Sequence, residues 1–270
     1  RVGDAKARLA GAAKVVEADY SFPYQNHAQM ETLCATVRWT AERCEMWGAT
    51  QVPEAALSTL AAAAELPLDV CEINTTRIGG SFGRRLATDY VRMAALIAKQ
   101  LPGIPVKMMW TREEDMTQGR FHPVTQCRMR ASLNEQGDVE AWHMRISGQS
   151  ITAYAWAEAM TDNGDPGTFQ GLAPEGDMAI GYSVPNLLID HAMRNPHIRP
   201  GYWRGVNLNQ NALYLECFID ELAHAAGQDP LAFRRKLMAK QKVATKQILM
   251  IMDGEPTAHL EGEYSYFNYP

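Results

Sequence analysis

The sequence has few cysteines, and their spacing excludes several kinds of metal site. The five are Cys34, Cys44, Cys71, Cys127 and Cys217, and no two of them form a C-x-x-C pair. Iron–sulfur clusters and zinc ribbons use such closely spaced pairs. We therefore expect no iron–sulfur cluster in this chain, and we expect most thiols to be buried as small apolar side chains. Cys34 and Cys44 could face each other across a hairpin, but their spacing does not require a disulfide.

Long apolar runs and an excess of basic charge are also lacking. No run approaches the roughly 20 residues that a membrane-spanning helix needs, and the N-terminal stretch RVGDAKARLAGAAKVV lacks the apolar core of a signal peptide. The 26 basic and 31 acidic residues give a net charge of -5, so no chain-wide basic surface favours nucleic acid or anionic lipid. We expect a soluble chain, and its start without Met indicates a processed or cut piece.

What is present is the composition of a globular protein with a packed core. The chain has 270 residues, of which 46% are hydrophobic, enough for one large domain or two modest ones. Strand and helix patterns alternate without a regular strand–helix–strand order, which favours an α+β fold. The predicted strands lie in 33–50 (two strands joined at TAER), 68–76, 104–110 and a hairpin over 124–149. The predicted helices lie in 52–66, 86–101, 207–227 and 229–240. Residues 150 to 185 predict a long loop.

The stretch RIGGSFGRR, residues 77–85, places three glycines and a phenylalanine between a predicted strand and a predicted helix. It fits neither G-x-G-x-x-G nor the phosphate-binding P-loop, which needs Lys followed by Ser or Thr. Glycines still let a cofactor or an anion approach main-chain N–H groups, and the start of the following helix favours negative charge. The alternative is a tight strand-to-helix turn without a ligand.

Two further stretches leave a predicted strand and enter a predicted helix. WGATQVPEAAL does so through Gln51, and PGYWRGVNLNQNALYLE does so through Arg204, with two aromatic residues before it and Gly205 after it. Three such loops therefore carry a neutral amide, bare backbone and a guanidinium. Their spacing leaves open whether they converge on one pocket.

Together these stretches resemble the molybdenum-binding large subunit of the xanthine dehydrogenase and aldehyde oxidoreductase family. The chain is most similar to the branch of the isoquinoline 1-oxidoreductase β-subunit and the membrane-associated bacterial aldehyde dehydrogenases. The similarity runs from about Val15 to Met238. It is carried, in this order, by PYQNHAQMETLCATV, GATQ, IGGSFGRR, VKMMWTREEDM, GRFHP and GYWRGVNLNQNALYLECFIDELAHAAGQDPLAFRRKLM.

The resemblance implies a mixed-sheet molybdenum cofactor-binding domain of α+β class. It implies a first molybdopterin-binding subdomain over 1–150, a second molybdopterin-binding segment over 151–240 and an irregular tail over 241–270. The implied cofactor is molybdopterin carrying molybdenum, in the cytosine dinucleotide form. In that family the metal is held by the dithiolene and by oxo, sulfido and hydroxo groups, so no protein ligand to the metal is expected.

The resemblance also assigns roles to individual residues. Gln51 matches the glutamine that hydrogen-bonds a metal oxo group or the pterin, with a turn-capping amide as the alternative. Arg204 matches an arginine that stabilises negative charge developing on the substrate, with a structural ion pair as the alternative. Phe82 walls the substrate pocket. The loop that passes close to the metal, where main-chain N–H groups meet cofactor oxygens, is matched by Gly79, Gly80, Ser81, Phe82 and Gly83.

Other positions in these motifs are assigned less firmly by the resemblance. Arg84 and Arg85 are typical of this branch, and either a pterin phosphate contact or a solvated surface is consistent with them. Leu86 stands where some members carry a substrate-orienting glutamate, which puts purine-type recognition in doubt. His27 and Glu31 invite a metal or acid–base role, but the family uses their region mainly for structure.

The chain departs from the family in one respect that bears on catalysis. The family's base is a glutamate in a G-x-G-E stretch near the C-terminus of the full subunit, and no G-x-G-E occurs here. Glu255 in DGEP and Glu263 in EGEY follow single glycines but do not match. The full subunit is also much longer, so we expect a fragment of a split or truncated subunit that needs the remaining part to complete its site.

The leading hypothesis is part of an enzyme that oxidises an aldehyde or an N-heteroaromatic ring with water as oxygen donor. Electrons would leave through a separate small [2Fe-2S] subunit, with a cytochrome c subunit as a further expected partner. The resemblance favours a bacterial periplasmic or membrane-associated location, although the compartment stays open. The competing hypothesis is a catalytically silent scaffold that has lost the glutamate. A loop that binds some other anion is a third hypothesis, but it leaves Gln51 and Arg204 unexplained.

Overall fold

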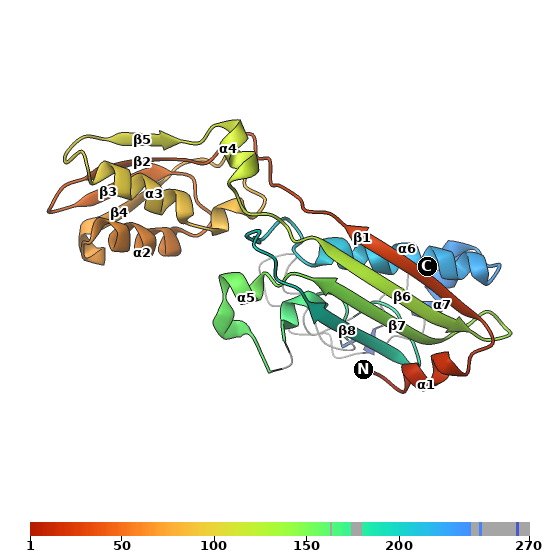
Figure 1. Ribbon diagram of the computed structural model, residues 1–270. Helices are drawn as coiled ribbons and strands as arrows, with labels where there is room; N and C mark the ends of the chain where they lie inside the picture. The colour runs from red at the N-terminus through yellow and green to blue at the C-terminus, as the bar shows by residue number, and fades with distance from the viewer. Residues whose placement is uncertain (163, 174–179, 239–242, 245–262, 265–270) are drawn as a thin grey trace.

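The chain folds into two α+β lobes, each built on a mixed four-stranded sheet (Figure 1). A computed structural model describes residues 1–162, 164–173, 180–238, 243–244 and 263–264. The smaller lobe contains residues 29–117, and the larger lobe contains the segments before and after it. Two connecting segments run side by side between the lobes, where Gln25 and His122 form an antiparallel bridge. The predicted α+β class is therefore confirmed.

The small lobe has the strand order β4-β3-β2-β5. Its strands are β2 (Cys34–Trp39), β3 (Cys44–Gly48), β4 (Cys71–Thr75) and β5 (Val106–Met109). β2 is antiparallel to β3 and β5, whereas β3 and β4 are parallel because helix α2 (Pro53–Ala64) connects them. Helix α3 (Asp89–Ala98) covers the same sheet, and the short helix α4 (Arg112–Thr117) follows β5. Single 3-10 turns lie at Leu68–Val70 and Arg84–Leu86.

Local sequence signals explain why the small lobe forms these elements. In β2 and β3 buried residues alternate with more exposed ones, as expected for strands with one covered face. Pro53 occupies the first helical position of α2, where its missing N–H group leaves no bond unmade. The helix ends at Glu65, whose left-handed backbone closes the last turn. Alanines let α2 and α3 pack closely on the sheet, in a core that includes Leu33, Met46, Leu60 and Tyr90.

The large lobe has the strand order β1-β6-β7-β8. Its strands are β1 (Val15–Phe22), β6 (Thr125–Leu133), β7 (Val139–Gly148) and β8 (Leu187–Met193). Helix α6 (Leu208–Ala225) packs on β1 and β6 and against α7 (Pro230–Met238), and the ring centroids of Trp142 and Phe218 lie 5.3 Å apart in this core, with the rings tilted against each other. The short helix α1 (Ala5–Ala10) packs against β7. Helix α5 (Thr152–Ala155) and 3-10 turns at Ala157–Ala159 and Pro166–Phe169 lie in the segment after β7.

The predicted elements of the small lobe and the hairpin β6–β7 are confirmed, as are helices α6 and α7. Strands β1 and β8 and helices α1, α4 and α5 were not predicted, and α5 lies inside the predicted loop over 150–185. β8 comes from the 151–240 segment and yet joins the sheet that holds β1, β6 and β7. The assignment of 1–150 and 151–240 as separate molybdopterin-binding segments stays a prediction. The expected irregular tail, with Glu255, lies outside the described residues, apart from the two-residue pair β9 (Val243–Ala244) and β10 (Glu263–Tyr264).

All five cysteines are free thiols, so Cys34 and Cys44 form no disulfide. Four of them titrate abnormally, because burial raises the pKa of Cys34, Cys71 and Cys127 and raises that of Cys44 to about 12. Within the described ranges, no helix has the length and apolar character needed to cross a bilayer.

Candidate functional site

Gln51 lies in the loop between β3 and α2, with an exposed side chain that reaches the glycine loop, residues 79–83. Its Oε1 accepts a hydrogen bond from the Ser81 hydroxyl and another from the Gly83 N–H at 3.2 Å. A main-chain N–H can only donate, so these contacts fix which amide atom faces the loop. The Nε2 group has no partner among the described residues and is left as a free donor.

The glycine loop leaves three consecutive main-chain donors unused. The N–H group of Gly79 donates to Glu31 and that of Gly83 donates to Gln51. The N–H groups of Gly80, Ser81 and Phe82 have no hydrogen-bond partner in the part of the chain that the structure describes. Such a row of unpaired donors on a surface loop is well suited to an oxygen-rich ligand.

Gly83 joins this loop to the segment before α6. Its φ is +103°, and a side chain there would place Cβ at 2.2 Å from the carbonyl oxygen of Tyr202, so only glycine fits. One residue earlier, the Phe82 carbonyl accepts a hydrogen bond of 2.9 Å from the Arg204 N–H. The structure therefore brings Gln51, the glycine loop and the main chain of Arg204 together, a convergence that the sequence spacing could not establish.

The guanidinium of Arg204 is exposed, and none of the described carboxylates forms an ion pair with it. The alternative of a structural ion pair is therefore not observed. The sequence predicts that Arg204 directly follows a strand, and this is wrong. β8 ends at Met193, and residues 194–207 form an irregular connection to α6. The arginine is positioned by main-chain contacts, and its charged group is free.

Backbone strain concentrates where the lobes meet. Four described residues other than glycine have positive φ, and Glu65 is explained by its role as helix cap. The other three are Ala28 next to His27, Phe82 in the glycine loop, and Val206 close to Arg204. A bulky or β-branched residue in this region is disfavoured and costs on the order of 1–3 kcal/mol. Such strain is typical of positions that a functional site constrains.

Arg84 and Arg85 are both buried, so the expectation of a solvated surface is wrong for each. Arg84 makes two bonds of 2.9 Å to the carboxylate of Asp89, and its guanidinium lies 5.5 Å from the centre of the Trp110 ring. Its Nε is buried without a described partner, so a cofactor contact by Arg84 stays a prediction. The pair with Asp89 accounts for its burial.

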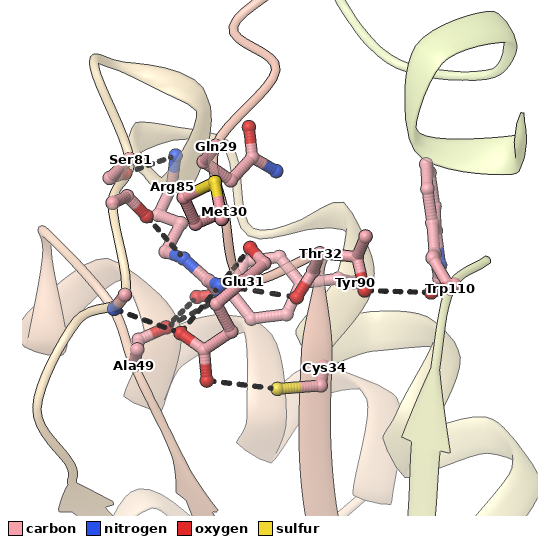
Figure 2. A network of polar contacts seen from close by, with 12 residues as sticks. Gln29, Met30, Glu31, Thr32, Cys34, Ala49, Ser81, Arg85, Tyr90 and Trp110 are labelled. Carbon is pink, nitrogen blue, oxygen red and sulfur yellow. Dashed lines mark hydrogen bonds and ion pairs between the residues drawn. The ribbon is translucent and has the colours of Figure 1, made fainter. Parts of the chain in front are cut away.

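Glu31 and Arg85 form a network beneath the glycine loop, which the sequence did not reveal (Figure 2). The Arg85 guanidinium is fully buried and pairs with the Glu31 carboxylate at 3.0 Å. The same carboxylate accepts the Gly79 N–H at 3.1 Å. The acid–base role considered for Glu31 is therefore replaced by a structural one. No local signal could have found this pair, because the two residues are 54 positions apart.

Two buried histidines contact main-chain carbonyls of the segment that contains Arg204. His27 contacts the carbonyl oxygen of Tyr202 through Nε2, and His122 contacts that of Val206 at 3.0 Å. Burial lowers the pKa of each imidazole below its ordinary value of 6.5. Both rings are therefore uncharged at neutral pH. The metal or acid–base role considered for His27 has no support in these contacts.

A cleft of about 380 Å³ opens beside Gly83 and Leu86, with Tyr202 on its wall. Arg120 also lines it and lies over the ring of Tyr154 at 5.2 Å. The cleft is therefore bordered by residues of both lobes and by the glycine loop. Among the described residues, no group of three His, Cys, Asp or Glu side chains is placed to hold a metal ion.

The fold and these contacts define a domain with a donor-rich site at a junction between two α+β lobes. Comparison with known proteins identifies its class: the sequence pattern of the molybdopterin cofactor-binding domain matches residues 1–238. The chain belongs to this family, which confirms the resemblance to a family of molybdopterin-dependent oxidoreductases.

Individual relatives agree with this assignment. One subunit of the nicotinate dehydrogenase of Pseudomonas putida is 30% identical over 87% of this chain and 20% of its own length. The aldehyde oxidoreductase molybdenum-binding subunit of Escherichia coli K12 is 28% identical over 86% of this chain and 30% of its own length. The chain thus spans less than a third of these curated relatives.

A solved structure shares the fold. The aldehyde oxidoreductase of Desulfovibrio gigas superposes with a TM-score of 0.71 and 20% identity, over 87% of this chain and 25% of that one. At that identity the likeness shows the architecture alone. It confirms the predicted mixed-sheet α+β domain.

The described residues fit a molybdopterin cofactor. The unpaired groups of Gln51, the glycine loop and Arg204 in the described structure are donors: the Gln51 Nε2 group, three loop N–H groups and the Arg204 guanidinium. They match a ligand rich in oxo and phosphate oxygens. Because the bound group would bring its own ligands to the metal, a site without a cluster of protein ligands is compatible with it.

Proposed function

We propose that this chain is the part of a molybdenum hydroxylase large subunit that holds the metal end of molybdopterin. The enzyme would oxidise an aldehyde or an N-heteroaromatic compound with water as oxygen donor. The single observation that carries this proposal is the set of unpaired donors at one junction, contributed by Gln51, the glycine loop and Arg204. Names of relatives that act on nicotinate, aldehydes and isoquinoline support the substrate class.

Each residue has a role that follows from its contacts. Gln51 donates from Nε2 to a cofactor oxygen and, being neutral, leaves the charge of the metal unchanged. The N–H groups of Gly80, Ser81 and Phe82 donate to the same ligand, while the half-exposed ring of Phe82 excludes water from one side of the substrate. Arg204 supplies a fixed positive charge for a substrate that gains negative charge. When bound, the cofactor supplies the redox-active metal that accepts the electron pair of the substrate.

Three finer points complete the proposal. The cofactor is the cytosine dinucleotide form, the proton-accepting glutamate comes from the remaining part of the large subunit, and electrons pass to a small [2Fe-2S] subunit. The names of relatives as subunits support a heteromeric assembly. A cytochrome c subunit is a further proposed partner.

The test is elemental and pterin analysis of the assembly that contains this chain, purified from its native source, together with aldehyde and N-heteroaromatic oxidation. We expect molybdenum equimolar with the chain and substrate-dependent reduction of an acceptor dye. A stable complex without molybdenum would contradict the proposal and would support a catalytically silent scaffold.

A further inference from the structure

The Arg85 guanidinium ties three separate parts of the small lobe together. Besides the Glu31 carboxylate, its nitrogens donate to main-chain carbonyls at 3.1 to 3.5 Å, those of Glu31, Thr32, Ala49 and Gly80. These carbonyls belong to the segment before β2, to the end of β3 and to the glycine loop. One buried side chain thus fixes the distances between these three parts.

The main chain of Arg85 also positions Gln51. Its carbonyl accepts the Gln51 N–H at 3.4 Å, and its own N–H donates to the Ser81 hydroxyl at 3.1 Å. From the other side, the Tyr90 hydroxyl donates to the Ala49 carbonyl at 2.6 Å, and the Tyr90 ring lies 5.7 Å from the guanidinium. Ala49, two residues before Gln51, is therefore held between Tyr90 of α3 and Arg85.

Glu31 fixes the start of the glycine loop. Its Oε2 accepts both the Gly79 N–H and the Arg85 guanidinium, and its Oε1 accepts the Cys34 thiol at 3.5 Å. The approach is close, because a Cβ added to Gly79 would lie 2.5 Å from the Glu31 Cβ. Residue 79 has no positive φ, so this close approach alone explains the glycine.

We propose that Glu31 and Arg85 are positioning residues that hold the Gln51 amide and the glycine loop in the geometry that the cofactor requires. This inference rests on the proposed function. Neither side chain needs to touch the cofactor, because both act through the loop that does. A fold-stabilising ion pair would not need to reach the carbonyl of Ala49, close before Gln51, and that of Gly80 in the glycine loop, whereas Arg85 contacts both.

Arginine suits this role better than lysine. Its rigid planar fork presents five donors, and here they serve a carboxylate and four carbonyls in fixed directions. Lysine would keep the charge and the pair with Glu31 but would lose several of the carbonyl bonds. The two substitutions Arg85→Lys and Glu31→Gln therefore separate fork geometry from charge.

The experiment compares the native assembly with its Arg85→Lys, Glu31→Gln and Gly79→Ala variants. The Gly79→Ala methyl group would clash with Glu31 and displace the glycine loop without removing a charge. This variant therefore still tests the inference if Arg85→Lys does not fold. The readouts are molybdenum per folded chain, the rate of molybdenum loss on dilution, and the electron paramagnetic resonance spectrum of Mo(V). We expect each variant to retain the cofactor on the order of tenfold less well, with an altered Mo(V) spectrum in the fraction that keeps it.

The matched control is Glu45→Gln, which breaks the Arg38–Glu45 pair on the sheet of the same lobe. It should leave all three readouts at wild-type values. Folded variants with wild-type molybdenum content and release would overturn the inference. So would variants that lose molybdenum but show the wild-type spectrum in the remainder, because that outcome indicates a role in stability alone. A wild-type assembly without molybdenum would instead overturn the proposed function.

Discussion

The two sides of the junction are held by different kinds of contact. On the small-lobe side, the ion pair between the buried Arg85 and the partly exposed Glu31, together with side-chain hydrogen bonds, fixes Gln51 and the glycine loop. On the large-lobe side, Arg204 is fixed by its main chain and by the fit of Gly83 against Tyr202, and its guanidinium has no partner among the described residues. The comparison contrasts a tightly held loop with an exposed arginine side chain that, under the proposed function, would meet substrate. Changes on the first side should cost stability, and changes at Arg204 should cost activity alone.

The largest effect is expected at Arg85. Arg85→Met removes the donors to four carbonyls and leaves the Glu31 carboxylate without its partner, so the free energy of unfolding should fall by about 3 kcal/mol or more. Denaturant unfolding measures it. Arg38→Met, which breaks a pair whose arginine is exposed in the same lobe, should cost less than about 1 kcal/mol. Equal decreases in the free energy of unfolding for Arg85→Met and Arg38→Met would show that the contacts of Arg85 stabilise the lobe no more than an ordinary surface pair does.

The next largest effect is expected at Gly83. Gly83→Ala combines an unfavourable backbone with a clash against the Tyr202 carbonyl and should cost about 2–4 kcal/mol. Gly103 is the control, because it also has positive φ but has nothing within 4 Å of an added Cβ. Gly103→Ala should therefore cost only the backbone term, about 1–2 kcal/mol. If both alanines cost the same in denaturant unfolding, the contact between the lobes at Gly83 contributes nothing.

Acid should weaken the junction through its histidines. Burial lowers the pKa of His27 and His122 below 6.5, so the unfolded chain binds protons more readily than the folded one. The stabilisation is complete above about pH 6.5 and is lost as the pH falls towards the folded-state values, at about 1.4 kcal/mol for each unit of difference. Melting curves between about pH 7.5 and 5 measure it. His122→Gln should flatten this dependence, whereas replacing the exposed His224 should not.

The smallest effect on stability is expected at Arg204. Arg204→Gln should change the free energy of unfolding by less than about 0.5 kcal/mol, because the guanidinium is exposed and unpaired in the described structure. Turnover by the assembled enzyme should fall by about tenfold or more, since a charge opposite the reacting substrate is lost. Arg199→Gln, at another exposed arginine, should leave turnover unchanged. A fully active Arg204→Gln enzyme would show that the arginine has no role in catalysis.

The sequence predicted the small lobe better than the large one, for a physical reason. Its hairpin and its strand–helix units use local patterns, such as TAER between β2 and β3 and Pro53 at the start of α2. Strands β1 and β8 pair with partners far along the chain, so periodicity alone did not reveal them. At the site, the motifs predicted Gln51 and the glycine loop. The Glu31–Arg85 pair needed coordinates, because an ion pair between distant residues has no sequence spacing of its own.

The central claim is that Gln51, the glycine loop and Arg204 surround one pterin-held metal. Anomalous diffraction at the molybdenum edge, from crystals of the native assembly, tests it most directly. We predict one strong peak beside the Gln51 amide and the N–H groups of Gly80, Ser81 and Phe82. A peak elsewhere in the chain, or none in fully assembled protein, would contradict the account.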